Sequence, residues 1–113
     1  MAFYVSKEWI GRIITTKLIS DRFAVIRFDL EKEGQLAVVN VYGPTGVVTR
    51  ENPEKGREFH DQVQEVYKSS MFFILGDFNS KIGLKAPTDT DFMGSYGKSK
   101  SRRNENGKNL RSW

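Results

Sequence analysis

The stretch Leu75-Gly76-Asp77-Phe78-Asn79 contains the residue types that point most directly to chemistry. A carboxylate and a carboxamide follow an apolar run and a glycine, and they lie two residues apart. In extended backbone these two side chains project to the same side, at the end of a buried strand, where open α/β sheets place ligands. Asp77 there can orient or deprotonate a water, and Asn79 can donate a hydrogen bond to a phosphate oxygen or to that water. Asp and Asn after glycine are also ordinary turn residues, and the spacing alone favours the turn.

A second polar pair, Asn40 and Tyr42, lies directly before Gly43-Pro44. The two side chains share a face because they are two residues apart on a predicted strand. A tyrosine hydroxyl at a strand end can hydrogen-bond a phosphate. The commoner situation is an amphipathic tyrosine at the rim of the core.

The first half of the chain is predicted to form the strands that position these residues. Residues 12–19 are rich in β-branched side chains, 22–30 alternate between two faces, and 35–42 form an apolar run that Gly43-Pro44 stops. Together with a strand near residues 2–6 they predict an antiparallel meander.

The second half predicts one helix and one further strand. Asn52-Pro53 gives a capping residue and a proline at the first helical position. The apolar stripe of this helix consists of Phe59, Val63, Val66 and Tyr67. Residues 71–75 form a short apolar run that predicts a strand buried on both faces. The fold class is therefore α/β (α+β), an antiparallel meander plus one helix and a buried strand, with one sheet face left uncovered.

The region after Asn79 is poor in apolar residues and predicts a long loop over residues 80–103, flexible or functional, before a helix that begins near Asn104. The loop and the C-terminal segment carry the excess positive charge. Residues 98–113 hold six Lys and Arg against one Glu, whereas the rest of the chain is nearly neutral. A polyanion such as nucleic acid is the obvious partner for Lys98, Lys100, Arg102 and Arg103, and a solvated tail explains the same charges equally well.

The composition excludes several classes of protein and site. The 113 residues suit one small domain at most. Cysteine is absent, which excludes disulfides, thiolate metal sites and a cysteine nucleophile. The longest apolar stretch is shorter than the roughly 18 residues of a membrane span, so no membrane association is expected. The first residues lack the pattern of a signal peptide, so an intracellular location is expected, in nucleus or cytoplasm.

Several motifs in order resemble the endonuclease/exonuclease/phosphatase superfamily. They are Asn-Val-Tyr-Gly-Pro-Thr at 40–45 and Phe-Ile-Leu-Gly-Asp-Phe-Asn-Ser-Lys-Ile-Gly at 73–83. More narrowly, the chain is similar to endonuclease domains of non-LTR retrotransposons and to craniofacial development protein 2-like proteins. That subgroup shares Ile-Ser-Asp-Arg-Phe at 19–23, the glycine-rich Gly-Ser-Tyr-Gly at 94–97, and Arg-Asn-Glu-Asn-Gly-Lys-Asn-Leu at 103–110.

The resemblance implies a partial four-layer α/β sandwich that hydrolyses phosphodiesters, DNA more than RNA, with an activated water. Asp77 would orient or deprotonate the water, Asn79 would hold the water or the phosphate, and Tyr42 would contact the scissile phosphate. The family requires a divalent cation, Mg²⁺ or Mn²⁺, to neutralise the phosphoryl oxygens, and Asp77 and Asn79 are the candidate metal ligands here.

The chain also departs from the family pattern. The family has a Gln-Glu metal-ligand motif before the first residue here and an Asp-His pair after the last, and neither is present. We therefore expect residues 1–113 to be an internal part of such a domain, with weak or no catalysis alone. The alternatives are a nucleic-acid-binding remnant without chemistry and a degenerate retroelement or gene-model fragment.

Overall fold

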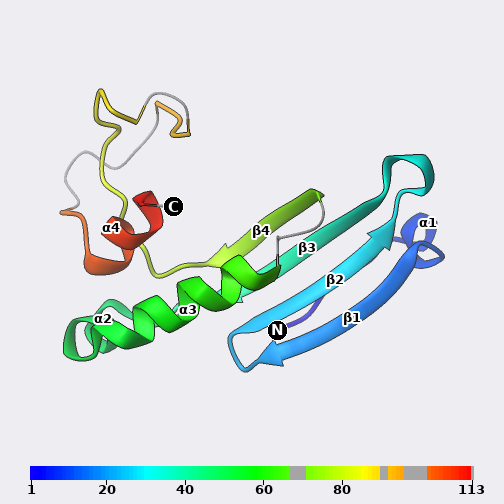
Figure 1. Ribbon diagram of the computed structural model, residues 1–113, viewed down its shortest axis with the longest axis horizontal. Helices are drawn as coiled ribbons and strands as arrows, with labels where there is room; N and C mark the ends of the chain where they lie inside the picture. Colours follow the sequence, from blue (N-terminus) through cyan, green and yellow to red (C-terminus); the bar gives the residue numbers. More distant parts are fainter. Residues whose placement is uncertain (67–70, 90–91, 96–101, 113) are drawn as a thin grey trace.

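The computed structural model describes residues 1–66, 71–89, 92–95 and 102–112, which form one sheet with helices beside it (Figure 1). The elements in chain order are α1 (Lys7–Ile10), β1 (Ile13–Ser20), β2 (Phe23–Asp29), the 3₁₀ turn η1 (Glu31–Glu33), β3 (Gln35–Tyr42), α2 (Gly46–Glu51), α3 (Pro53–Val66), β4 (Met71–Asp77) and α4 (Glu105–Arg111).

The four strands form a mixed sheet in the order β1-β2-β3-β4. β1, β2 and β3 are antiparallel neighbours, which confirms three strands of the predicted meander. β4 lies parallel to β3, and the chain between them runs through α2 and α3. The chain is thus of mixed α/β class, as predicted.

The hydrophobic core lies between α3 and one face of the sheet. Phe23 and Val39 of the sheet pack there with Phe59 and Val63 of α3, and all four are at most 7% exposed. The helix begins at Pro53 as predicted, because the Oδ1 of Asn52 accepts a hydrogen bond from the Glu54 amide at 3.2 Å. The predicted apolar stripe of α3 is confirmed at its first two positions, because Phe59 and Val63 are both buried against the sheet. Its last member, Tyr67, lies outside the described residues.

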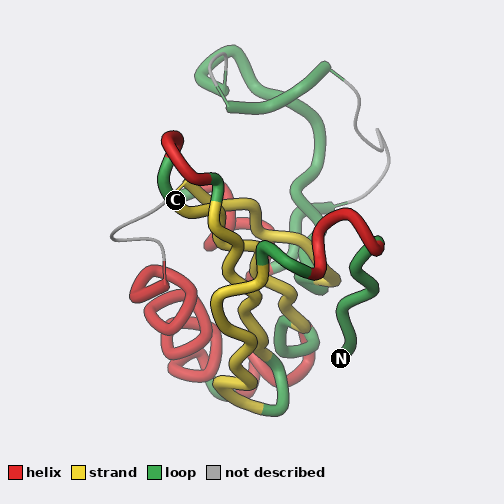
Figure 2. The backbone as a smooth tube through the Cα atoms, turned by 90° about the vertical axis from the view of Figure 1, so that its right-hand side faces the viewer, coloured by secondary structure: helices red, strands yellow, loops and turns green. Residues whose placement is uncertain are grey.

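The predicted strand at residues 2–6 is wrong. This segment runs over the face of the sheet opposite α3 and joins no edge, so its backbone makes no ladder (Figure 2). The carbonyl of Ala2 accepts a hydrogen bond from the Asn40 side chain at 3.4 Å. Farther along, the Trp9 ring in α1 meets Phe28 edge to face at 5.4 Å between centroids. The N-terminal segment thus covers part of the face that the sequence left bare.

The prediction that residues 71–75 are buried on both faces is also wrong. β4 is the edge strand, and three of its side chains, Met71, Phe73 and Leu75, are each more than half exposed. Ile74, on the opposite face, packs against the core. An edge strand covered by helix on one side only cannot bury both faces, however apolar its sequence.

Two short helices complete the described part of the chain. α2 was not predicted, because only Thr49 in it is buried and its six residues carry no apolar stripe. α4 begins where the sequence placed a helix, and the Asn104 side chain caps it by accepting from the Gly107 amide. Throughout the described ranges, no helix combines the length and the hydropathy that a bilayer span needs.

Candidate functional site

The candidate site lies where β3 and β4 end side by side. Tyr42 and Asp77 are register partners at the carboxyl ends of these parallel strands. The Gly43 amide donates to the Asp77 carbonyl at 2.7 Å, which ties the two strand ends together. Parallel pairing thus brings together residues that are 35 positions apart in sequence, at the sheet edge where ligands bind in open α/β sheets.

Two glycines allow this close approach. A Cβ on Gly43 would lie 2.5 Å from the carbonyl oxygen of Phe78. A Cβ on Gly76 would overlap the backbone of Val41, and the φ of this glycine is +138°. The glycines of the Tyr-Gly-Pro and Gly-Asp-Phe-Asn motifs therefore have a structural reason, the contact between the two strand ends.

Asp77 and Asn79 form a turn and also line a cavity. The Oδ1 of Asp77 accepts from the Asn79 amide at 2.8 Å, and Asn79 has a left-handed φ of 48°. The Asn79 side chain donates to the Gly43 carbonyl at 2.7 Å. The assumption that extended backbone continues through these two residues is therefore wrong, since β4 ends at Asp77. Asp77 and Asn79 are turn residues, as the spacing favoured. They also line the cavity, so a role in binding a ligand stays a prediction.

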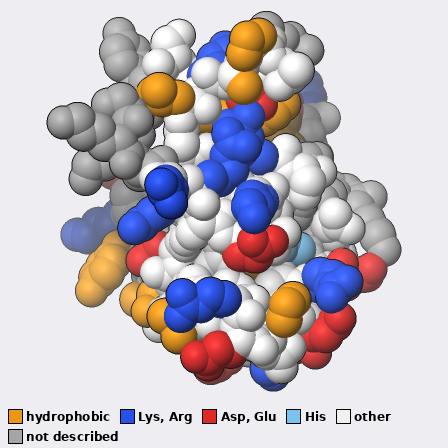
Figure 3. Space-filling model, turned by 90° about the vertical axis from the view of Figure 1, so that its left-hand side faces the viewer, with side chains coloured by type: hydrophobic (Ala, Val, Ile, Leu, Met, Phe, Trp, Pro, Cys, Tyr) orange, Lys and Arg blue, Asp and Glu red, His pale blue; other side chains and the backbone are white. Residues whose placement is uncertain are grey.

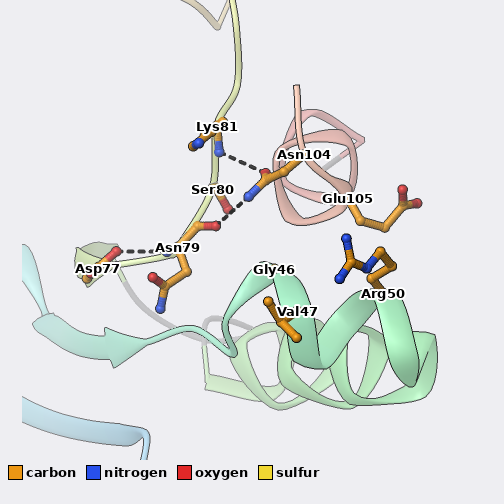
Figure 4. Close-up of a pocket in the computed structure, with 9 residues that line it drawn as sticks. All are labelled: Gly46, Val47, Arg50, Asp77, Asn79, Ser80, Lys81, Asn104 and Glu105. Atoms are coloured by element: carbon orange, nitrogen blue, oxygen red, sulfur yellow. Dashed lines mark hydrogen bonds between the residues drawn. The ribbon is translucent and has the colours of Figure 1, made fainter. Parts of the chain in front are cut away.

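The ends of β3 and β4, with the residues 43–44 and 78–81 that follow them, form one corner of the sheet. The cavity at this corner has a volume of about 650 Å³ (Figure 4). Asp77 and Asn79 lie on one wall, and Arg50 of α2 and Lys81 contribute positive charge. The complete lining is Gly46, Val47, Arg50, Asp77, Asn79, Ser80, Lys81, Asn104 and Glu105. Sequence reasoning missed Arg50, which lies on the unpredicted α2. Lys81 lies in the motif at 73–83, and Asn104 and Glu105 lie in the motif at 103–110, but the motifs alone assign these three residues no role.

Tyr42 is adjacent to this cavity but does not line it. The ring is 45% exposed, and the Arg22 guanidinium lies 5.5 Å from its centroid. The same arginine donates weakly to the carbonyls of Tyr42 and Gly43, at 3.5 and 3.4 Å. The structure thus places the backbone of Tyr42 beside Asp77 and its ring beside Arg22.

The predicted nucleic-acid-binding residues are described only in part. Lys98 and Lys100 lie outside the described residues. Arg102 and Arg103 are exposed, and the Nε of Arg103 donates to the Ile82 carbonyl at 3.2 Å. Figure 3 shows Lys and Arg side chains spread over this end of the molecule, with acidic side chains among them.

The described residues offer a metal ion few ligands. They contain no group of three or more His, Asp or Glu side chains that could hold one. Two carboxylates line the cavity, and that of Glu105 pairs with Lys108 at 2.9 Å, so Asp77 is the better donor. The amide orientation of Asn79 commits its nitrogen to Gly43 and leaves Oδ1 as a second oxygen donor. This set suits Mg²⁺ only as a largely hydrated ion that also contacts phosphate.

Comparisons with protein-family models, with curated proteins and with solved structures found no match to this chain. The family resemblance therefore rests on its motifs, chiefly Tyr-Gly-Pro at 42–44 and Gly-Asp-Phe-Asn at 76–79. The roles of Tyr42, Asp77 and Asn79 remain predictions. The structure shows that these three residues lie together at one corner of the mixed sheet.

Proposed function

We propose that this chain carries the phosphate-binding and metal-binding part of a Mg²⁺-dependent phosphodiesterase that acts on DNA. The observation that supports this function best is the cavity that Asp77 and Asn79 line together with Arg50 and Lys81. It lies at the ends of parallel strands, where Tyr42 is the register partner of Asp77. A carboxylate, an amide and two cations around one cavity are suited to a phosphodiester and an attacking water.

Each side chain has a chemical task in this proposal. Asp77 accepts a proton from the attacking water or orients it, and the Oδ1 of Asn79 accepts a hydrogen bond from the same water. Arg50 and Lys81 attract the phosphate, since both are exposed cations on the cavity wall. A divalent cation held by Asp77 and Asn79 would offset the negative charge of the phosphoryl oxygens.

Catalysis by this part alone should be slow or absent. Hydrolysis of this kind also needs a general acid for the leaving oxygen. Glu105, the second carboxylate on the cavity wall, is paired with Lys108 at 2.9 Å. The one histidine of the chain, His60, lies on α3 and does not line the cavity. We further propose that the sheet and α3 are two layers of the four-layer sandwich to which the sequence resemblance points.

A test of this function measures DNA binding and plasmid nicking, each with Mg²⁺ or with EDTA. We expect Mg²⁺ to strengthen binding of a short duplex several-fold, and we expect little or no nicking. Asp77→Asn should abolish the effect of Mg²⁺ while keeping the oxygen that accepts from the Asn79 amide. Asp61→Asn, at an exposed position of α3, is the matched control. Binding that ignores both Mg²⁺ and Asp77→Asn would contradict the proposal, and nicking lost in Asp77→Asn would contradict the expected inactivity.

The second candidate function is nucleic-acid binding without chemistry, which one observation favours. The exposed Arg102 and Arg103 directly precede Asn104, which lines the cavity. Binding of this kind needs no metal and weakens steeply with salt, because each phosphate contact releases counterions. Charge reversal at Lys98, Lys100, Arg102 and Arg103 separates the two candidates. It should abolish metal-independent binding and leave any Mg²⁺-dependent component at Asp77.

A further inference from the structure

Three segments that are distant in sequence meet beside the candidate site. They are the Gly43-Pro44 turn after β3, residues 79–81 after β4, and residues 104–107 at the start of α4. The side chains of two asparagines, Asn104 and Asn106, donate to backbone carbonyls of the other two segments. They add to the bond from the Asn79 side chain to the Gly43 carbonyl.

Asn104 uses both ends of its amide. Its Oδ1 accepts from the Gly107 amide and from the Lys81 amide, each at 2.8 Å. Its Nδ2 donates to the Asn79 carbonyl at 2.8 Å (Figure 4). A helix cap requires only the first of these bonds. The other two hold the chain after β4.

Asn106 makes the second half of the connection. The residue is 3% exposed, and its Nδ2 donates to the Pro44 carbonyl at 2.6 Å and to the Asn79 carbonyl at 3.2 Å. The Asn79 carbonyl therefore receives donors from both asparagines. Two donors on one part-buried carbonyl restrict the rotation of the peptide that follows Asn79.

The start of α4 also lies directly against the carbonyl of Lys81, two residues after Asn79. A Cβ on Gly107 would overlap the carbonyl of Lys81, so the helix could not approach as closely with any other residue there. The Asn104 amide in turn donates to the same carbonyl at 3.3 Å. The contact is therefore formed by backbone on both sides, which makes its geometry specific.

We infer that Asn104 and Asn106 are positioning residues for the candidate site. They hold Asn79 in its left-handed conformation and fix the Asp77–Asn79 turn against the Gly43-Pro44 turn, without touching the phosphate themselves. The inference deepens the proposed function and rests on it for its consequence, the affinity for metal and phosphate. Its structural part, the dependence of the Asn79 conformation on the two asparagines, can be measured without any ligand.

The test uses Asn104→Asp, which keeps the oxygen that caps α4 and replaces the donor to Asn79 with an oxygen. A negative charge at this position also favours the helix N-terminus. Backbone chemical shifts are recorded for Asn79 and for residues 105–111, and Mn²⁺-induced line broadening is measured at Asp77. We expect the helix shifts to stay and the Asn79 shifts to move away from left-handed values. The new carboxylate lines the cavity and would itself attract Mn²⁺, so the metal affinity is compared in the uncharged variant Asn106→Ser.

Two further variants complete the experiment. Asn109→Asp places the same substitution in the same helix and should leave the Asn79 shifts and the Mn²⁺ affinity unchanged. Asn106→Ser shortens the second donor without adding charge. It should move the Asn79 shifts in the same direction as Asn104→Asp and lower the Mn²⁺ affinity roughly tenfold, which keeps the test decisive if Asn104→Asp fails to fold.

Unchanged Asn79 shifts in both Asn104→Asp and Asn106→Ser would overturn the inference. The inference would also fail if Asn104→Asp removed the helical chemical shifts of residues 105–111 and left the Asn79 shifts unchanged. Asn104 would then be a helix cap and nothing more. If instead the wild-type protein binds no Mn²⁺ at Asp77 while the Asn79 shifts respond as expected, the proposed function fails and the structural part of the inference stands.

Discussion

The core and the candidate site are held together by different forces. Between α3 and the sheet, apolar side chains such as Phe23, Val39 and Val63 are at most 1% exposed and pack against one another. At the corner after β3 and β4, side-chain amides of Asn104 and Asn106 bind backbone carbonyls. Apolar packing is non-directional and tolerates swaps of similar volume, whereas hydrogen bonds depend on angle and on donor identity. The core should therefore determine whether the chain folds, and the corner should determine where its functional groups lie.

The largest effect should come from the core. Phe23→Ala removes a ring that is 0% exposed and should lower the free energy of unfolding by about 3–5 kcal/mol. Phe73→Ala removes the same ring from a position that is 58% exposed on the opposite face, and should cost much less. Urea unfolding followed by circular dichroism measures both. Equal losses would contradict the assignment of the core to the α3 side of the sheet.

The next effect should come from the ion pair between Asp89 and Arg111, which is a buried electrostatic contact. Both side chains are about one-tenth exposed or less, and Arg111 also donates to the Leu84 carbonyl at 3.1 Å. Asp89→Asn leaves the guanidinium without its counter-charge and should lower the free energy of unfolding by about 3 kcal/mol. Glu54→Gln, which breaks the exposed pair with Arg57, is the control and should cost less than about 1 kcal/mol. A similar cost for the two variants would argue against a buried pair.

A pair of milder variants should separate the two regions. Phe23→Leu keeps an apolar side chain in the core and should lower the free energy of unfolding by about 1–2 kcal/mol, with no change in Mn²⁺ affinity at Asp77. Asn106→Ser should clearly lower that affinity for at most a similar loss of stability. Urea unfolding and Mn²⁺ titration of both proteins test this difference. If the two variants change both quantities in proportion, the regions are not independent.

The smallest effect concerns His60, which lies half-buried on α3 beside Phe59. Burial lowers the pKa of His60 below its usual range, against a smaller opposite effect of Asp61. The unfolded chain therefore binds this proton at a higher pH than the folded chain does, so stability falls as the pH drops below about 6.5. Urea unfolding at pH 7.5 and pH 5.5 should show a smaller pH difference in His60→Gln than in the wild type. An unchanged difference would mean that this histidine is not responsible.

The core could be predicted from sequence because its signals are periodic. The alternation over residues 22–30 and the stripe through Phe59 and Val63 identified the sheet strands and the helix that cover each other. Burial of Met71 and Phe73 could not be predicted correctly, because an apolar run does not reveal whether its strand is at an edge. The segment at residues 2–6 failed for a similar reason, since extended backbone can lie on a sheet face as well as along its edge.

The candidate site could be predicted in its residue types and not in its geometry. Asp77 and Asn79 stood out because a carboxylate and an amide follow an apolar strand. Arg50 carries no such signal, since its helix is short and lacks an apolar stripe. Asn106 is buried by contact with the Pro44 carbonyl, 62 positions away in sequence, and no local pattern encodes that contact. Long-range polar contacts of this kind became visible only in three dimensions.

We propose above that the corner formed by Asp77 and Asn79 binds a divalent cation. The most direct measurement is a titration of the wild-type protein and Asp77→Asn with Mn²⁺, followed by line broadening of the backbone amide resonances. We expect broadening centred on residues 77–80 in the wild type, reversed by EDTA and lost in Asp77→Asn. Broadening spread evenly over exposed carboxylates, or the same pattern in the variant, would contradict it.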